Sequence, residues 1–333
     1  MKPVIFGLSG PVLTADEAAF FRDADPLGYI LFGRNCVDRA QMRALTDSLR
    51  DLSGRDDLPI LIDQEGGRVA RMQPPEWPAF PAGPAFDALY EVAPSSAIEA
   101  ARANGQALAL MLAEVGVNVN CAPLLDVRMP ETTPAVGGRT FGSDPMRVAA
   151  LGRAMLDGMA KGGVVGVVKH MPGHGRGVVD SHYELPVVDA DDAALERDIE
   201  PFRTLRDAPM GMTCHVVFKA WDADHPATLS PTVIRDVIRG RIGFDGLLMT
   251  DDIDMKALSG TAGEKAAQAI AAGCDVALDC WARMGEMEEI VGRLSDAPPV
   301  TLARLERAMA RARPEPGAID DLIAKREALL ALA

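Results

Sequence analysis

Eight short apolar runs recur along the chain, each followed closely by glycine or by polar residues. Helical patterns separate them, as in residues 97–115, 195–206 and 231–239, with Ser230 as a candidate N-cap for the last. Strand and helix alternating eight times predict a single (β/α)8 TIM-type barrel of the α/β class rather than a doubly wound sheet. The runs span residues 4–8, 28–32, 59–62, 117–121, 164–168, 210–214, 246–249 and 274–278.

The length and composition suit one large core. The chain has 333 residues, of which 48% are hydrophobic and 25% charged. No linker leads to a second core, so we expect one domain over residues 1–333. An Ala/Leu/Arg/Glu pattern predicts a C-terminal helical tail over about 300–333, broken at the Pro-Glu-Pro of 314–316. We expect the proline-rich loop 74–81 to wrap the rim of the site.

Charge and apolar patterning exclude several classes of protein. A net charge of −14 argues against a nucleic-acid partner. No run approaches the roughly 18 apolar residues that cross a membrane, and the first residues lack a signal-peptide pattern. The five cysteines are scattered, with no CxxC, so a disulfide framework or zinc knuckle is not expected. These features predict a cytoplasmic protein without membrane partners.

Titratable residues gather where the predicted strands end. Active sites of barrels lie at the carboxyl ends of the strands. Charged or imidazole groups follow five of the eight runs, and this grouping predicts a polar site at that end of the barrel. The groups are Asp63-Gln64-Glu65, Asp126 with Arg139, Lys169-His170, His215 and Asp251-Asp252.

Three of the five histidines lie within residues 169–182. Pro172 and the glycines around it exclude a continuous helix, which predicts a loop. Within this loop, the Asp180 carboxylate lies two residues from the His182 imidazole. It can bond one ring nitrogen and fix which nitrogen carries the exchangeable proton. Such a pair suits proton donation to a leaving group, although a purely structural pair remains an alternative.

Asp251 is the first carboxylate after the seventh run. At the mouth of a barrel it can act as a nucleophile, a general base or a metal ligand. We expect Asp252 and Asp254 instead to cap a helix that begins near Met255.

Lys169 and His170 are candidates for binding substrate hydroxyls. His174 follows His170 at a spacing that suggests zinc, but Pro172-Gly173 forbids the helix that presents such a pair. We expect His174 to hold the loop through backbone contacts.

Arg139 follows a pair of glycines and suits a substrate oxygen or carboxylate. Asp63, followed by Arg71, forms the mixed acidic and basic group that holds neighbouring sugar hydroxyls. A salt bridge on the rim is the alternative for this pair.

These segments together resemble glycoside hydrolase family 3, specifically the short single-domain bacterial β-N-acetylhexosaminidases of cell-wall recycling. The resemblance covers nearly the whole chain, and the 169–182 segment is its most specific part. The matching segments are ILFGRN (30–35), IDQEGGRV (62–69), APLLD (122–126), GRTFG (138–142), KHMPGHG (169–175), DSH (180–182), HVVF (215–218) and TDDIDM (250–255).

The resemblance implies a two-step retaining mechanism. Asp251 attacks the anomeric carbon, and His182, paired with Asp180, serves as the acid/base. The residues that align with sugar-binding positions are Asp63, Arg71, Arg139, Lys169 and His170. The resemblance also implies that neither a metal nor a cofactor is needed.

Three segments depart from the family pattern without removing a catalytic group. Met171 stands where phenylalanine is frequent, and Ile253-Asp254 replace a Leu-Ser type pair. Gly137-Gly138 replace a bulkier pair, a change that can loosen the positioning of Arg139. The larger β-glucosidases of the family use a second domain, and its absence here favours the hexosaminidase branch.

The leading hypothesis is removal of terminal β-linked N-acetylglucosamine from peptidoglycan fragments, namely N-acetylglucosaminyl-1,6-anhydro-N-acetylmuramic acid and its peptides. The expected partner is therefore a small carbohydrate, and the expected state a monomer. A glycoside phosphorylase, with phosphate as acceptor, is the main alternative. A silent sugar-binding barrel and a metal-dependent hydrolase using His170, His174 and Asp251 are minor ones.

Overall fold

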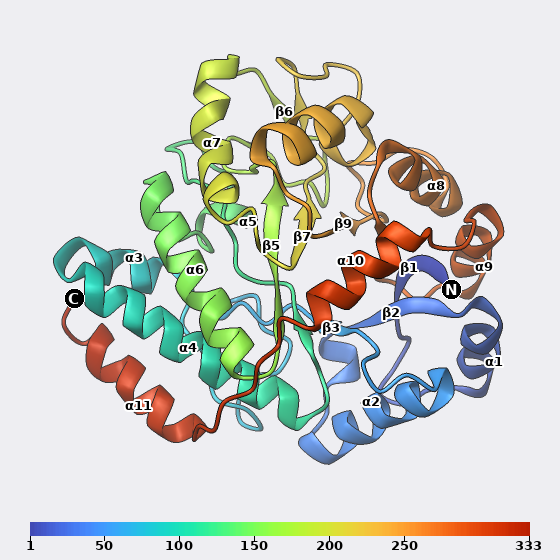
Figure 1. Cartoon of the computed structure of the whole chain (residues 1–333), viewed down its shortest axis with the longest axis horizontal. Helices are drawn as coiled ribbons and strands as arrows, with labels where there is room; N and C mark the ends of the chain where they lie inside the picture. The colour runs from blue at the N-terminus through green and yellow to red at the C-terminus, as the bar shows by residue number, and fades with distance from the viewer.

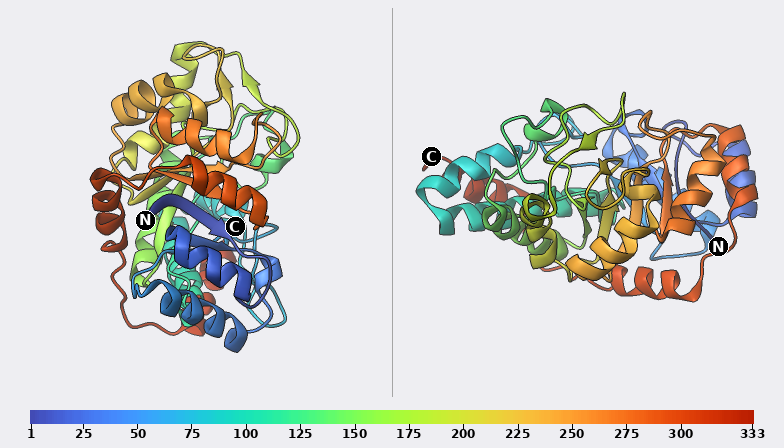
Figure 2. Two further views of the ribbon diagram at one scale, coloured as in Figure 1. Left: turned by 90° about the vertical axis from the view of Figure 1, so that its right-hand side faces the viewer. Right: turned by 90° about the horizontal axis from the view of Figure 1, so that it is seen from above.

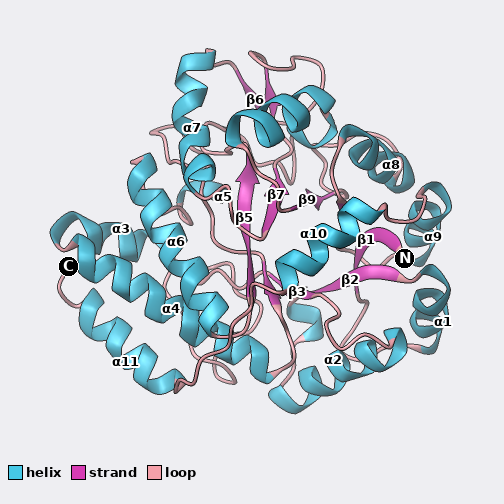
Figure 3. Cartoon of the chain, in the orientation of Figure 1, coloured by secondary structure: helices cyan, strands magenta, loops and turns pink.

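The computed structural model describes all 333 residues and contains a closed barrel of eight parallel strands. The strands neighbour one another in the order β1, β10, β9, β7, β5, β4, β3, β2. The barrel is closed because β1 pairs with β10 on one side and with β2 on the other. Figure 3 shows the strands gathered at the centre with helices around them. Their bounds are β1 Lys2–Gly7, β2 Pro26–Leu31, β3 Ile60–Ile62, β4 Val119–Asn120, β5 Val165–Met171, β7 Met210–Thr213, β9 Leu247–Asp252 and β10 Val276–Asp279.

Each of the eight predicted runs contains or overlaps one barrel strand, so the barrel prediction is confirmed. Parallel strands are covered on both faces, and they therefore appear in the sequence as short continuous apolar runs. The interior of the barrel is filled by one residue in two, such as Ile5, Val167 and Leu278. Their neighbours face the surrounding helices.

The helices begin and end at recognisable caps. Thr14 caps α1 and Thr261 caps α8 through capping boxes, and Asp191 caps α7. The helices are α1 Ala15–Ala24, α2 Arg39–Ser53, α3 Gly83–Val92, α4 Pro94–Glu114, α5 Pro134–Gly137, α6 Pro145–Lys161, α7 Asp192–Thr204, α8 Ala262–Ala272, α9 Met284–Arg293, α10 Pro299–Met309 and α11 Ile319–Leu330. Short 3-10 turns span Gly33–Asn35 and Ala227–Leu229.

The helix predicted over residues 231–239 forms, and most of it, Val233–Ile242, has π-type hydrogen bonding. Ser230 Oγ accepts the Val233 backbone N–H at 3.0 Å, so the predicted N-cap is confirmed. The patterns over 97–115 and 195–206 correspond to α4 and α7.

The two C-terminal helices, α10 and α11, pack against the barrel and its surrounding helices. In Figure 1, α10 crosses in front of the strands, and its Ala308 joins the apolar interior of the barrel. Leu305 and Met309 pack against the same interior. Figures 1 and 2 place α11 beside α4, where Arg326 of α11 donates a 3.0 Å hydrogen bond to Asn104.

Two further strands outside the barrel, β6 Val187–Val188 and β8 Val217–Phe218, pair in parallel. They join the loop after β5 to the loop after β7. In the proline-rich loop, Trp77 and Phe80 are buried in the apolar core. No helix has the length and apolar composition that a membrane crossing requires.

Candidate active site

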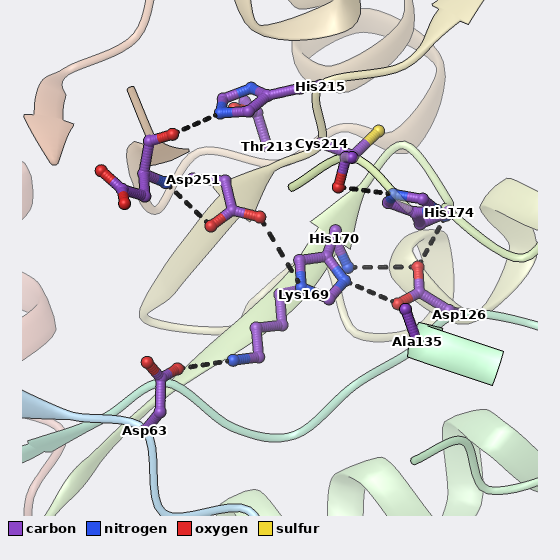
Figure 4. Close-up of polar contacts among 12 residues, drawn as sticks. Asp63, Asp126, Ala135, Lys169, His170, His174, Thr213, Cys214, His215 and Asp251 are labelled. Carbon is purple, nitrogen blue, oxygen red and sulfur yellow. Dashed lines mark hydrogen bonds and ion pairs between the residues drawn. The ribbon is translucent and has the colours of Figure 1, made fainter. Parts of the chain in front are cut away.

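The carboxyl ends of β3 and β5 carry a buried cluster of charges. Lys169 lies within β5, and only 2% of its side chain is exposed. Its Nζ lies 2.9 Å from Asp63 Oδ1 and 2.8 Å from Glu65 Oε1, and Figure 4 shows it reaching toward Asp63. Arg71 donates to the second oxygen of Asp63 at 3.2 Å. Arg139 binds both oxygens of Glu65, at 2.8 and 2.6 Å.

Opposite charges keep this cluster ionised. Burial alone raises the pKa of a carboxyl group, because the charged form loses its hydration. For Glu65, Arg139 and Lys169 outweigh burial and hold the pKa at about 2. Lys169 and Arg71 likewise lower the pKa of Asp63, and the two carboxylates raise that of Lys169 against the effect of its burial. All three side chains are therefore charged at neutral pH.

Asp126, which follows β4, holds the loop that begins at the end of β5. Its Oδ1 accepts the backbone N–H groups of His170 at 3.2 Å and His174 at 2.7 Å. Its Oδ2 lies 2.7 Å from His170 Nδ1. The opposite nitrogen, His170 Nε2, faces Asp251 Oδ2 at 3.9 Å, so His170 lies between two carboxylates in Figure 4. Burial raises the pKa of Asp126, but the neighbouring His170 outweighs burial and lowers the pKa of Asp126 to about 2.

Asp251 lies at the end of β9 and keeps a partly exposed carboxylate, with 21% of its side chain accessible. Its Oδ1 accepts the Asp252 backbone N–H at 2.8 Å. Burial raises the pKa of Asp251, yet His170, His215 and Lys169 lower it below its ordinary value overall. The result is an ionised and partly exposed carboxylate, which is what a nucleophile requires.

His182 and Asp180 form the expected pair in the loop after β5. Asp180 Oδ1 lies 2.7 Å from His182 Nδ1 and also accepts the His182 backbone N–H at 3.0 Å. The Nδ1 proton therefore points to the carboxylate, and Nε2 is the nitrogen left to exchange a proton. The side chain of His182 is 65% exposed.

One cavity brings these groups together. Its empty volume is about 270 Å³, and its lining includes Asp251, His170 and Arg139 together with Asp180 and His182. A carboxylate at the end of β9 and an imidazole in the loop after β5 thus face the same space. That arrangement can attack a substrate with one group and exchange a proton with the other.

The loop that carries His182 is anchored along its length. A Cβ at Gly175 would lie 1.8 Å from the Val127 carbonyl oxygen, so only glycine permits this close approach. Further along, Thr133 donates its backbone N–H to the Gly177 carbonyl at 2.9 Å. The pairing of β6 with β8 holds the far end.

Comparison with known proteins identifies the family of the chain. The profile of the glycosyl hydrolase family 3 N terminal domain matches residues 14–313. The chain belongs to glycoside hydrolase family 3. A beta-hexosaminidase from Chromobacterium violaceum is 37% identical over 321 residues, which cover 94% of this chain and 88% of that one. One from Bordetella avium is 36% identical over 92% of this chain and 88% of its own length.

Solved structures of the family superpose closely. Native NagZ from Neisseria gonorrhoeae gives a TM-score of 0.85 at 30% identity and covers 99% of this chain and 96% of its own. A family 3 beta-N-acetylglucosaminidase from Paenibacillus gives 0.87 at 30% identity, covering 98% of this chain and 66% of that one. This family 3 chain is a glycoside hydrolase of the β-N-acetylhexosaminidase type.

Two histidines of this family 3 site, His215 and His174, hold neighbouring segments in place through hydrogen bonds. His215 is buried between Thr228 Oγ1, at 2.8 Å, and the Asp252 carbonyl oxygen, at 2.9 Å. His174 fixes its loop through its backbone, as expected, and its ring lies 3.3 Å from Ser181 Oγ. Burial and the neighbouring His170 lower the pKa of His174 to about 4, so its ring is neutral at pH 7.

One sequence expectation is wrong. Asp252 and Asp254 do not cap a helix, because the chain turns after β9 and α8 begins only at Ala262. Asp252 Oδ1 instead accepts the Asp254 backbone N–H at 3.1 Å and orders that turn.

Arg139, which follows the two glycines, has three hydrogen bonds to acceptors in the site. Its guanidinium makes two bonds to Glu65 and a third to the Ala135 carbonyl at 3.2 Å, so its position depends on these acceptors. His170, His174 and Asp251 do not converge as metal ligands. Nowhere in the chain are three or more His, Cys, Asp or Glu side chains grouped so that they could hold a metal ion.

Sequence reasoning missed the roles of Glu65 and Asp126. Both are among the strand-exit groups that predict the polar site, but the sequence indicates no individual role for either. Their partners lie far away in the chain, and the only local signal was a carboxylate after a buried run.

Proposed function

We propose that the chain is a retaining exo-β-N-acetylglucosaminidase. The observation that carries this proposal is the shared cavity of Asp251 and the His182–Asp180 pair. Asp251 is ionised and partly accessible, which suits a nucleophile. His182 has one nitrogen engaged by a carboxylate and the other available, which suits a proton carrier.

The reaction has two steps. Asp251 attacks the anomeric carbon while the protonated His182 gives its Nε2 proton to the leaving oxygen, and the glycosidic bond breaks. The neutral imidazole then takes a proton from water. The resulting hydroxide equivalent attacks the anomeric carbon, and the Asp251 carboxylate leaves. Asp180 keeps the Nδ1 proton in place throughout and so holds His182 in the useful tautomer.

The terminal sugar is held by the charge cluster in this proposal. Arg139 and His170 line the cavity, and Asp63 and Arg71 are partly exposed members of the same charge cluster. Lys169 is almost fully buried, so it acts chiefly by orienting Asp63 and Glu65. Hydrogen bonds from ionised side chains to hydroxyl groups are stronger than neutral ones, and buried ion pairs hold them in position.

The substrate we propose is a peptidoglycan fragment with a terminal β-linked N-acetylglucosamine, handled in the cytoplasm by a monomer without a metal or cofactor. NagZ from Neisseria gonorrhoeae, in complex with N-trifluoroacetyl-D-glucosamine, has a TM-score of 0.87 with this chain and is 29% identical. That complex supports an N-acetylated amino sugar as the group that enters the cavity.

The first experiment compares turnover of an aryl N-acetyl-β-glucosaminide with the matching β-glucoside. Asp251→Ala should abolish turnover of the N-acetyl sugar in a protein that still folds, measured by product release and by circular dichroism. Residual turnover above about one per cent refutes Asp251 as the nucleophile.

Added phosphate or chelator should not change the turnover of the N-acetyl sugar. Faster turnover with a sugar phosphate as product establishes a phosphorylase instead.

The second experiment tests the proton donor. His182→Ala should lower turnover of substrates with poor leaving groups by about 100-fold or more, because those leaving groups need a proton. Activated aryl glycosides should lose much less. Equal losses for both kinds of substrate, measured as kcat/KM, refute the acid role.

A further inference from the structure

A second cavity lies at the end of the barrel opposite the active site. It is formed by the segment before β7, the segment before β9, and α10 with the residues that follow it. These strands begin at the cavity, whereas Asp251 lies at the other end of β9. The empty volume is about 520 Å³. The charged side chains of the lining are Arg206, Asp207, Asp245, Arg304, Arg307 and Arg311.

Arginines outnumber carboxylates in this lining by four to two. The chain as a whole has 48 acidic and 34 basic residues, so the local excess is opposite to the net charge. Other exposed arginines have carboxylates in plenty. Arg203 and Arg241, for example, share Asp192, Glu196 and Glu200 between them. A hollow with an excess of positive charge attracts an anion.

The two carboxylates leave many donors of the arginines unused. Arg307 donates only through Nη2, to the carboxylate of Asp245 at 3.0 Å and to its backbone carbonyl at 3.1 Å. Arg311 also donates only through Nη2, to the backbone carbonyl of Asp207 at 3.2 Å and its carboxylate at 3.4 Å. Arg206 is exposed, and its side chain has no carboxylate within the 4.0 Å of an ion pair. A guanidinium group has several N–H donors, so these three arginines can bind a further acceptor.

The wall of the cavity is rigid because α10 is fixed to the barrel. Arg304 Nη1 lies 2.9 Å from Oδ1 of the buried Asp275, and Arg304 Nη2 lies 2.8 Å from Asp245. Ala308 of the same helix packs into the apolar interior. The cavity therefore exists before a ligand arrives, which lowers the cost of ordering on binding.

We propose that this cavity binds the phosphate group of a small molecule, either inorganic phosphate or a phosphorylated sugar. A phosphate dianion matches the excess of two positive charges in the lining. Its oxygens accept hydrogen bonds in several directions, and arginine forms paired bonds with such a group. Arg206 approaches from the segment before β7, and Arg307 approaches from α10. The cavity is larger than a phosphate group alone, which leaves room for a sugar.

The test measures binding to the full chain by isothermal titration calorimetry. The probes are inorganic phosphate and glucose 6-phosphate, at constant ionic strength. Both should bind and raise Tm, because a ligand of the folded state stabilises it. Sodium chloride at the same ionic strength should not raise Tm. Tighter binding of glucose 6-phosphate identifies a phosphorylated sugar as the ligand, and equal or weaker binding identifies the free ion.

Variants of exposed arginines locate the bound phosphate. Arg206→Gln should weaken phosphate binding by about fivefold, and Arg206→Gln combined with Arg307→Gln by more than about 20-fold. Arg43→Gln is the matched control, since it removes an exposed arginine that pairs with Asp47 at 3.0 Å on α2. It should leave phosphate binding unchanged. All the variants should keep the circular dichroism of the unmodified chain and its turnover of an aryl N-acetyl-β-glucosaminide.

No binding of either phosphate up to about 10 mM overturns the proposal. Equal affinity of the double variant and the unmodified chain also overturns it, and competition between phosphate and the aryl substrate then identifies the active site as the place of binding. The site is independent of the hexosaminidase activity. If the chain turns over no N-acetyl sugar while phosphate binding still depends on Arg206 and Arg307, the proposed function fails and the phosphate site stands.

Discussion

Buried carboxylates at the same end of this barrel have two different surroundings. Asp63 and Glu65, near β3, contact Lys169 and two arginines. Asp279, at the end of β10, is fully buried, and neither of its oxygens has a hydrogen-bond partner. It lies in the layer between strand and helices, with the acidic Asp252 close by. The comparison separates the effect of burial from the effect of the partners that accompany it.

The two surroundings shift the carboxyl groups in opposite directions. Burial, reinforced by Asp252 and Glu286, raises the pKa of Asp279 to about 7, whereas the pKa of Glu65 is about 2. The stability from Glu65 is present above its ordinary pKa and is lost as the pH falls toward 2. Asp279 behaves oppositely, because its folded state keeps a proton that the unfolded chain has released. Its effect is an increasing destabilisation as the pH rises from about 4 through 7.

The largest expected effect comes from removing the shared cation. Lys169→Met leaves Asp63 and Glu65 buried with one cationic partner fewer each. We expect a loss of about 3–5 kcal/mol in the free energy of unfolding, measured with denaturant, and a loss of activity. The surface pair Lys161–Glu315, broken by Lys161→Met, should cost less than about 1 kcal/mol. Similar costs for both variants would contradict the difference between buried and exposed pairs.

Asp279→Val should stabilise the protein in a pH-dependent way. Valine is apolar, has a similar volume and needs no partner in this layer. Compared with the unmodified chain, we expect a gain of about 3 kcal/mol in the free energy of unfolding at pH 8 and little gain at pH 4, where Asp279 is protonated. Unfolding curves at the two pH values measure the difference. A gain that does not depend on pH would show that charge at Asp279 is not the cause.

The smallest effect is expected at Gly138. A Cβ there finds its nearest atom, the Pro134 carbonyl oxygen, at 3.9 Å. If the bonds to Glu65 position Arg139, Gly138→Ala should change the free energy of unfolding by less than about 0.5 kcal/mol and kcat/KM by less than about twofold. A tenfold change in kcat/KM would show that the local backbone, and not Glu65, sets the position of Arg139.

The barrel was predictable because its strands are covered on both faces. Each strand is therefore an apolar run, and the polar residue after it marks the mouth, as with Asp251 and Lys169. The Asp180–His182 contact was also predictable, since the two residues are neighbours in the chain. The resemblance to family 3 supplied the roles that this spacing left open.

Contacts between distant segments were not predictable. Glu65 joins Lys169 and Arg139 across many residues, and no local pattern records such a partnership. The two-residue strands β6 and β8 are too short for a period to appear. The turn after Asp251 contains a carboxylate followed by apolar residues, which is also the pattern of a helix start, and this similarity produced the wrong expectation there.

The pairing of β1 with β10 has a consequence for biosynthesis. The first strand leaves the ribosome long before its neighbour, which begins only at Val276. Until then one edge of the sheet has unpaired N–H and C=O groups, and α10, which covers one part of the interior, is still missing. During synthesis this unpaired edge must not pair with another chain. A chain that is truncated before residue 276 lacks β10, so its barrel cannot close.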